Sequence, residues 1–243
     1  MTRRSPSRPV GSAVLPAPST ARAATGRNLA ALAARAWKVR ALGSEHVPRL
    51  GPVLLASNHT AFLDGLVLAA SAPRPVHLLA GSELFVAPLD RLLRGTGQIA
   101  VDHDRPDRSA LRTAAEVLSV GGVVGVFPEP QRGTGDARHA RHEAAYLAAR
   151  TGAVVVPVAI LGARPAGTLR DALPRLGARI DVVFGEPVDI RVAGDRRRRA
   201  VLARSGERLR QALADHVLAA CARTGRQLPG PPSDPSHPTR SDP

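Results

Sequence analysis

Short apolar runs alternate with longer stretches rich in alanine and leucine along most of the chain beyond residue 43. The runs are rich in β-branched residues and apolar at successive positions, which predicts strands that are buried on both faces. We predict strands over 53–56, 76–80, 98–101, 123–127, 154–160 and 180–184. The stretches between them predict helices over 65–70, 82–93, 108–119 and 138–149, with a last helix over about 196–224.

This alternation is typical of a largely parallel sheet, because a connection between parallel strands has to cross the sheet, usually through a helix. The 243 residues are enough for one domain with a complete core and too few for two large ones. The sequence therefore predicts an α/β fold, with a single domain whose mostly parallel central sheet is flanked by helices.

Both ends of the chain differ from this pattern. Residues 1–26 are rich in Pro, Ser, Arg and Ala without periodicity, and 227–243 are rich in Pro and Ser, so we predict disordered tails around a domain over 27–226. Residues 28–42 predict an amphipathic helix with Trp37 on its apolar side. This helix would pack on the domain or, alternatively, lie in a membrane interface with Trp37 at the level of the headgroups.

The charge of the chain favours anionic partners. The net charge is +14, and Lys38 is the only lysine, so arginine carries the positive charge. Such a chain favours nucleic acid, an anionic membrane surface or phosphorylated substrates. Aromatic residues make up only 2%, with no ladder for base stacking, so we predict no nucleic-acid partner.

Two further features of the composition exclude other classes of protein. The single cysteine, Cys221, excludes an internal disulfide framework and a multi-cysteine metal site. No run approaches the ~18 apolar residues that span a bilayer. We therefore expect a soluble or peripheral protein.

The candidate chemistry begins at the end of the first predicted strand, in the segment NHTAFLD. His59 and Asp64 lie five positions apart there, where the side chains of an α/β fold meet ligands. An imidazole can take a proton from an alcohol, and a nearby carboxylate can hold the ring in the required tautomer. On spacing alone this pair is weak support for catalysis, because structural histidines are common.

Three other segments at strand ends add polar or unusual residues. GQIAVDH leads into His103 and Arg105, and VFPEPQRG ends a strand with Glu129 and Arg132 three positions apart. The run VVPVAI contains Pro157, which predicts an edge strand or a bulge beside a site.

In this order, NHTAFLD, GQIAVDH, VFPEPQRG and VVPVAI resemble the four sequence blocks of the glycerolphosphate acyltransferase family. The resemblance is greatest to its 1-acylglycerol-3-phosphate (lysophosphatidate) acyltransferase branch, and it covers about residues 39–187. The first block, with its HX4D spacing, is the most specific of the four.

The resemblance implies an O-acyltransferase in which His59 is the general base and Asp64 orients it. The donor would be acyl-CoA or acyl-carrier protein, the acceptor a lysophospholipid, and neither a metal nor a bound cofactor would be required. Substrate-binding positions expected from the blocks are Asn58, Gly97, His103, Arg105, Glu129 and Arg132. Such an enzyme of phospholipid biosynthesis would be cytoplasmic and peripheral on the inner face of the cell membrane.

The chain departs from the family pattern at the acceptor side. His103 stands where the second block normally has arginine, and Pro130 and Gln131 replace the glycine and threonine of the third block. Gly81 and Ser82 stand where a basic residue commonly precedes the Glu-Leu pair. Two alternatives therefore remain open: the same chemistry on a different lyso-lipid or amino-acid-based lipid, and a non-catalytic basic lipid-binding protein.

Overall fold

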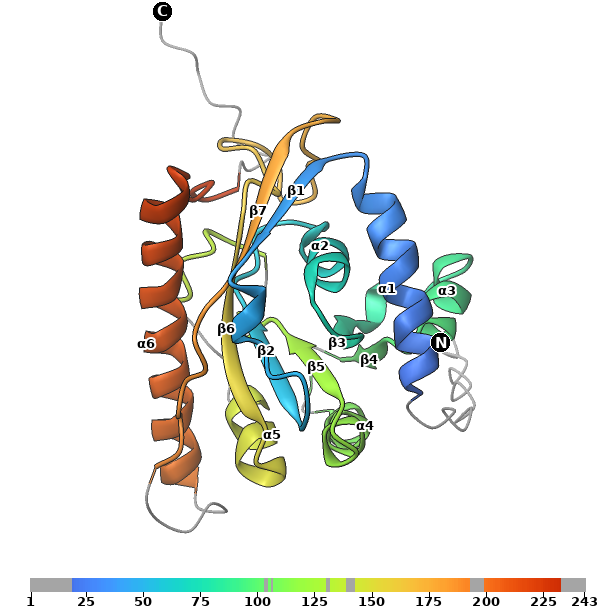
Figure 1. The fold of residues 1–243 in the computed structure, drawn as a ribbon, viewed down its shortest axis with the longest axis vertical. Coiled ribbons are helices and arrows are strands. Elements are labelled where there is room, and N and C mark those ends of the chain that lie inside the picture. The colour runs from blue at the N-terminus through green and yellow to red at the C-terminus, as the bar shows by residue number, and fades with distance from the viewer. Residues whose placement is uncertain are drawn as a thin grey trace, which may run out of the picture.

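The computed structural model describes residues 19–102, 105, 107–129, 132–138, 143–192 and 199–232. Its centre is a seven-stranded sheet with the order β1-β7-β6-β2-β5-β3-β4 (Figure 1). The strands are β1 (Lys38–Leu42), β2 (Val53–Ser57), β3 (Val76–Gly81), β4 (Ile99–Val101), β5 (Val123–Val126), β6 (Val154–Leu161) and β7 (Arg179–Phe184). Neighbouring strands are parallel except β6 and β7, which are antiparallel. The predicted mostly parallel sheet is thus confirmed.

Helices cover both faces of this sheet (Figure 1). On one side lie α1 (Thr20–Ala34), α2 (Asp64–Ser71) and α3 (Leu89–Gly95), and on the other α4 (Arg108–Ser119), α5 (Glu143–Thr151) and α6 (Arg199–Thr224). Short 3-10 helices η1 (Ser44–His46) and η2 (Ser82–Leu84) follow β1 and β3.

Strand β2 shows why the runs along the chain are continuously apolar. Val53 and Leu55 pack into the core cluster under α2, while Leu54 and Ala56 pack into the cluster under α4 and α5. All four side chains are fully buried. Because successive side chains of a strand point to opposite faces, a strand covered on both sides must be apolar at every position.

The predicted helix over 28–42 is wrong in its bounds. Helix α1 spans Thr20–Ala34, and the last 5 residues of the predicted segment form β1, an edge strand that pairs with β7. The face that α1 buries carries only Ala23, Gly26, Ala30 and Ala34. Because these side chains are small, α1 can approach its neighbours closely. Leu29 and Leu32, which the amphipathic pattern predicts to be buried, lie on the other side of the helix and are exposed.

The predicted tails also begin too far inside the domain. Residues 20–26 belong to α1, and residues 227–232 run along the domain with Leu228 packed against the core under α6. The rest of both predicted tails, 1–18 and 233–243, lies outside the described residues.

Proline accounts for two further differences. The helix predicted over 82–93 is divided into η2 and α3, and Pro88, which has no N–H to donate, immediately precedes α3. Pro157 lies in the interior strand β6 and not at an edge. As predicted, it faces a bulge, because the partner segment has one residue more than β6 between the pair Val158–Phe184 and the bridge Val155–Val188. It is tolerated because it sits where the ladder with β7 ends, with its carbonyl accepting from the amide of Gly185 at 2.8 Å.

The close packing of α1 gives a test of the fold. A Cβ atom at Gly26 would lie 2.8 Å from Cβ of Thr96, a distance that real Cβ atoms do not reach. We expect Gly26→Val to lower the free energy of unfolding by about 1–3 kcal/mol through overpacking. Urea unfolding measures this change. Ala31→Val, at an exposed position of the same helix, should cost no more than about 0.7 kcal/mol of helix propensity. Equal losses in the two variants would contradict this packing of α1.

Candidate active site

The site is built at the carboxyl end of β2, where Asn58 follows the last residue of the strand. Its Nδ2 donates to the carbonyl of Ile160 on β6 (3.2 Å), and its Oδ1 accepts from the amide of the same residue (2.7 Å). The side chain of Asn58 thus makes the hydrogen bonds to Ile160 that the backbone of β2 would make if the strand continued. The main chain can therefore turn away from the sheet at this point. Asn58 is fully buried and does not line the pocket described below. It therefore positions the loop after β2 and does not contact the pocket itself.

The turn that follows is tied to the first residue of α2, Asp64. One carboxylate oxygen, Oδ2, accepts from Nδ1 of His59 (2.9 Å) and from the amides of Thr60 (2.6 Å) and Ala61 (2.8 Å). The carboxylate is fully buried and lies at the helix N-terminus, where the helix dipole favours negative charge. The HX4D spacing is thus the length of the loop that brings the imidazole back to this carboxylate.

The imidazole of His59 is held on a second side by Phe127, which follows β5. The two rings stack with centroids 4.3 Å apart and planes inclined by 24°. In the neutral ring, the contact with Asp64 requires the proton on Nδ1, which leaves Nε2 with a lone pair. The side chain of His59 is 19% exposed and faces a pocket, so this arrangement can accept a proton from a bound hydroxyl.

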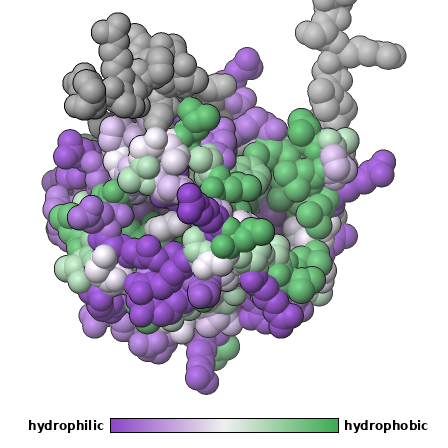
Figure 2. Space-filling view, turned by 90° about the horizontal axis from the view of Figure 1, so that it is seen from above, coloured by the Kyte–Doolittle hydropathy of each residue, from purple (hydrophilic) through white to green (hydrophobic). Residues whose placement is uncertain are grey.

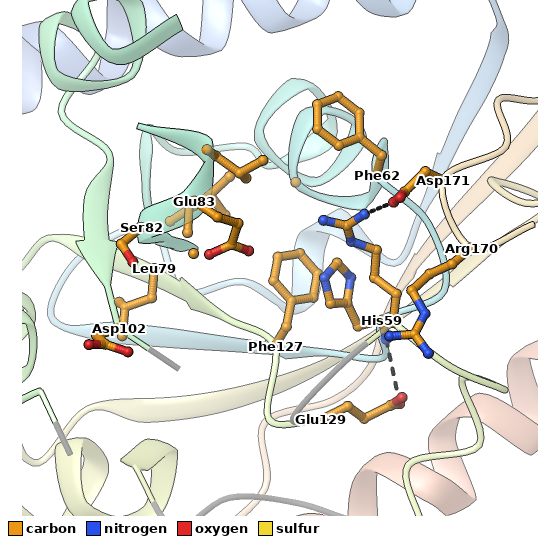
Figure 3. A pocket seen from close by; sticks show the side chains of 16 residues that line it. His59, Phe62, Leu79, Ser82, Glu83, Asp102, Phe127, Glu129, Arg170 and Asp171 are labelled. Atoms are coloured by element: carbon orange, nitrogen blue, oxygen red, sulfur yellow. Dashed lines mark hydrogen bonds and ion pairs between the residues drawn. The ribbon is translucent and has the colours of Figure 1, made fainter. Parts of the chain in front are cut away.

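The pocket has a volume of about 630 Å³ and opens beside His59 (Figure 3). Apolar side chains of β3, of η2 and of the ends of β2 and β5 form much of its lining: Phe62, Leu78, Leu79, Leu84 and Phe127. Its polar lining comes from His59, Ser82, Glu83, Asp102, Glu129, Arg132, Arg170 and Asp171. A space lined by both apolar and charged side chains can hold a molecule that is part lipid and part ion.

Of the positions predicted to bind substrate, the structure brings Glu129 and Arg132 to this pocket together with His59. Arg132 forms an ion pair with Asp171, and its guanidinium lies over the ring of Phe62, 5.7 Å from the centroid. Both contacts hold the positive charge at the mouth of the pocket.

Two other predicted positions, Gly97 and Arg105, lie away from the pocket. Gly97 forms the left-handed turn before β4, and its carbonyl accepts from Nδ1 of His77 at 2.7 Å, outside the pocket lining. Arg105 is exposed and does not line the pocket. His103 lies outside the described residues, as do Pro130 and Gln131.

The structure adds polar residues that the sequence patterns did not single out. Arg170 and Asp171 come from the β6–β7 loop, residues 162–178, and Glu83 comes from η2. Neither loop residue belongs to a recognisable block. Only the pairing of β6 with β2 brings the β6–β7 loop to His59.

A buried arginine, Arg164, connects the β6–β7 loop to the rest of the site. Its Nε donates to the carbonyl of Thr60 (2.9 Å), and its Nη2 donates to the carbonyls of Gly133 (3.0 Å) and Gly230 (2.6 Å). Its Nη1 donates to the carbonyl of Thr168 (3.1 Å). The planar guanidinium thus joins four segments that are far apart in sequence.

Glu129 is the one pocket residue whose ionisation is strongly perturbed. Burial raises the pKa of its carboxyl group to about 7, although backbone amides of His59 and Ala137 hydrogen-bond to it and act in the opposite direction. The negative charges of Asp136 and Asp64 add to the increase. Glu129 therefore changes its charge near neutral pH, directly behind the loop that carries His59.

The fold and site define an α/β protein with an imidazole–carboxylate pair whose imidazole faces a pocket of about 630 Å³. The model of the acyltransferase family matches residues 38–161, just over half of the chain. The chain belongs to the acyltransferase family, which confirms the resemblance drawn from the four blocks.

Two curated relatives carry the name 1-acyl-sn-glycerol-3-phosphate acyltransferase. The protein of Borreliella burgdorferi is 28% identical over 127 residues, or 51% of this chain and 51% of the relative. The protein of Bacillus subtilis is 26% identical over 152 residues, or 62% of this chain and 73% of the relative. The match thus spans about half the length of the first relative and about three quarters of the second.

A solved structure has the same fold. The crystal structure of the 1-acyl-sn-glycerophosphate (LPA) acyltransferase PlsC from Thermotoga maritima matches with a TM-score of 0.61 and 22% identity. The match covers 84% of this chain and 78% of that one. Among the described residues, no helix is long and apolar enough to cross a membrane.

The raised pKa of Glu129 predicts a specific pH dependence of stability. Because the folded protein binds this proton more tightly than the unfolded chain, Glu129 lowers stability as the pH rises from about 4.5 through about 7. Above about 7 this loss approaches about 3 kcal/mol. Urea unfolding of wild type and Glu129→Gln across this range should show two curves that diverge as the pH rises, with the variant the more stable. Parallel curves would contradict this prediction.

Proposed function

We propose that this chain is an O-acyltransferase of phospholipid biosynthesis that acylates the free hydroxyl of a lysophospholipid. The observation that carries the proposal is the 2.9 Å contact between Nδ1 of His59 and Asp64 at the mouth of the pocket. The names of the two curated relatives support 1-acylglycerol-3-phosphate as the first acceptor to test, with phosphatidate as the product.

In the proposed reaction, Nε2 of His59 takes the proton of the acceptor hydroxyl while the oxygen attacks the thioester carbonyl. The carbon–sulfur bond then breaks, and the departing sulfur takes the proton back from the imidazolium as the free thiol. Asp64 stabilises the imidazolium that exists between these steps. Because a thioester is already activated, a base and the alignment of both substrates supply most of what the reaction needs.

The donor in this proposal is acyl-CoA or acyl-carrier protein, and no metal or bound cofactor takes part. The guanidinium groups of Arg132 and Arg170 suit the phosphate of the acceptor, since each can donate two parallel hydrogen bonds to phosphate oxygens. Leucines and phenylalanines of the pocket suit the acyl chain.

A second candidate acceptor has support from the opposite wall of the pocket. Glu83 and Asp102 line it across from Arg170 (Figure 3). A lyso-lipid that carries an amino group in addition to its anionic group would complement both walls. The same chemistry on such an acceptor is therefore the alternative.

The proposed site of action is the inner face of the cell membrane, where a cytoplasmic thioester donor meets a lipid acceptor. The net charge of +14 supports attraction to anionic headgroups, because each arginine near such a surface adds about 1 kcal/mol.

An acceptor screen with one acyl-CoA, run side by side for wild type and His59→Ala, tests the proposal. We expect transfer to 1-acylglycerol-3-phosphate, and a rate about 10²–10⁴-fold lower in the variant, because a general base contributes that much. His46→Ala is the control, since that imidazole contacts the carbonyl of Phe184 outside the pocket and its loss should leave the rate intact.

The outcomes of the screen separate the alternatives. Transfer only to phosphate-free or amino-bearing lyso-lipids would contradict the proposed acceptor and favour the second candidate. Equal rates in wild type and His59→Ala would contradict the proposed base. No transfer to any acceptor would favour the non-catalytic lipid-binding alternative.

A further inference from the structure

The β6–β7 loop exposes an unusual amount of apolar surface. Leu169, Leu173 and Leu176 are 51%, 56% and 78% exposed, and all three lie within one short stretch. A single exposed leucine on a protein surface is ordinary, but neighbouring ones indicate a surface that is covered by something else.

This apolar stretch adjoins the mouth of the pocket. Two residues of the same loop, Arg170 and Asp171, line the pocket, and Asp171 pairs with Arg132. Arg132 in turn lies over the ring of Phe62, a residue that is 44% exposed. Figure 2 shows hydrophobic side chains gathered on this face of the molecule beside strongly hydrophilic ones.

The loop is a fixed surface, because it is anchored to the turn that follows α1. The amide of Gly177 donates to the carbonyl of Ala36 at 2.7 Å, and Nε1 of Trp37 donates to the carbonyl of Pro174 at 3.2 Å. Pro174 is itself buried, so the leucines on either side of it are held outward. Trp37, predicted on the apolar side of a helix, instead follows α1 and supports this loop.

The charges on the loop indicate what covers it. Arg170 and Arg175 alternate with the exposed leucines, so that apolar and cationic side chains project from the same surface. Leucine gains free energy from entering hydrocarbon, while arginine at the same depth meets phosphate in the headgroup layer. A chain with a net charge of +14 is attracted to an anionic bilayer in addition.

We propose that the segment 169–176 is the element that docks this protein on an anionic lipid bilayer, with Phe62 beside it at the entrance of the pocket. Docking by this segment sets the pocket mouth on the membrane, so that a lyso-lipid can pass from the bilayer to His59 without crossing water. The inference rests on the proposed function for the identity of the lipid substrate. The docking itself is independent of catalysis.

A triple variant, Leu169→Ser with Leu173→Ser and Leu176→Ser, tests the docking segment by flotation with vesicles of phosphatidylcholine and phosphatidylglycerol. We expect its binding to be weaker by on the order of a hundredfold, because three side chains lose their transfer into hydrocarbon. The control is Leu50→Ser with Val120→Ser, which changes two exposed apolar side chains at the opposite end of β2 and β5. The control should bind as the wild type does.

Several results would overturn the proposal. They are equal binding by wild type and the triple variant, an equal loss in the control, and no binding by the wild type. A triple variant that binds normally but no longer forms an oligomer of the wild-type chain would assign the surface to a second copy instead.

Acyl transfer separates this inference from the proposed function. With a short-chain acceptor dissolved in water, the triple variant should act at the wild-type rate, whereas with the acceptor embedded in vesicles its rate should fall with its binding. If the wild type transfers acyl groups to neither acceptor, the proposed function is contradicted. The flotation experiment still tests whether the segment 169–176 binds the bilayer.

The only tryptophan of the chain, Trp37, gives a second measurement that needs no variant. Because its indole is hydrogen-bonded to the loop, we expect its emission to shift to shorter wavelength when the wild-type protein binds vesicles, and to be quenched by brominated lipids. Binding without either change would contradict docking through this segment.

Discussion

The geometry of the site depends on one carboxylate oxygen, Oδ2 of Asp64. It accepts three hydrogen bonds at once, from the ring of His59 and from the amides of Thr60 and Ala61, while its own residue begins α2. The loop, the imidazole and the helix are therefore oriented together, before any ligand is bound. Such preorganisation is what a proton-accepting group needs, because the cost of ordering it is met during folding.

Distant parts of the chain converge on this loop through β6. Asn58 pairs with Ile160, and Arg164 carries the connection onward to the Thr60 carbonyl and to the segment after α6. The β6–β7 loop, which contains Arg164, also supplies Arg170 to the pocket and exposes leucines on the surface. The interior strand thus links the proposed base, the charged mouth of the pocket and the proposed membrane surface.

The sequence predicted most of the sheet, and the misses have physical reasons. Runs such as 53–56 could be recognised because both faces of each strand are buried, and His59 and Asp64 because the loop that joins them is local. Helix α1 buries alanines and exposes leucines, so a pattern that looks for large apolar residues on the inner face misplaces it and hides β1. Arg164 and Arg170 reach the site only through tertiary structure. The hydrogen bonds of Asn58 to the backbone of Ile160 could not be predicted either, because the two residues are 102 positions apart in sequence.

The central claim is that Asp64 holds His59 with its proton on Nδ1, so that Nε2 is free to accept another. Heteronuclear NMR of the isotope-labelled imidazole nitrogens measures this tautomer directly in the folded protein. The account predicts that, in the neutral ring, Nδ1 carries the hydrogen and Nε2 does not, and that Asp64→Ala abolishes the preference. A neutral ring protonated on Nε2, or the same tautomer with and without the carboxylate, would contradict it.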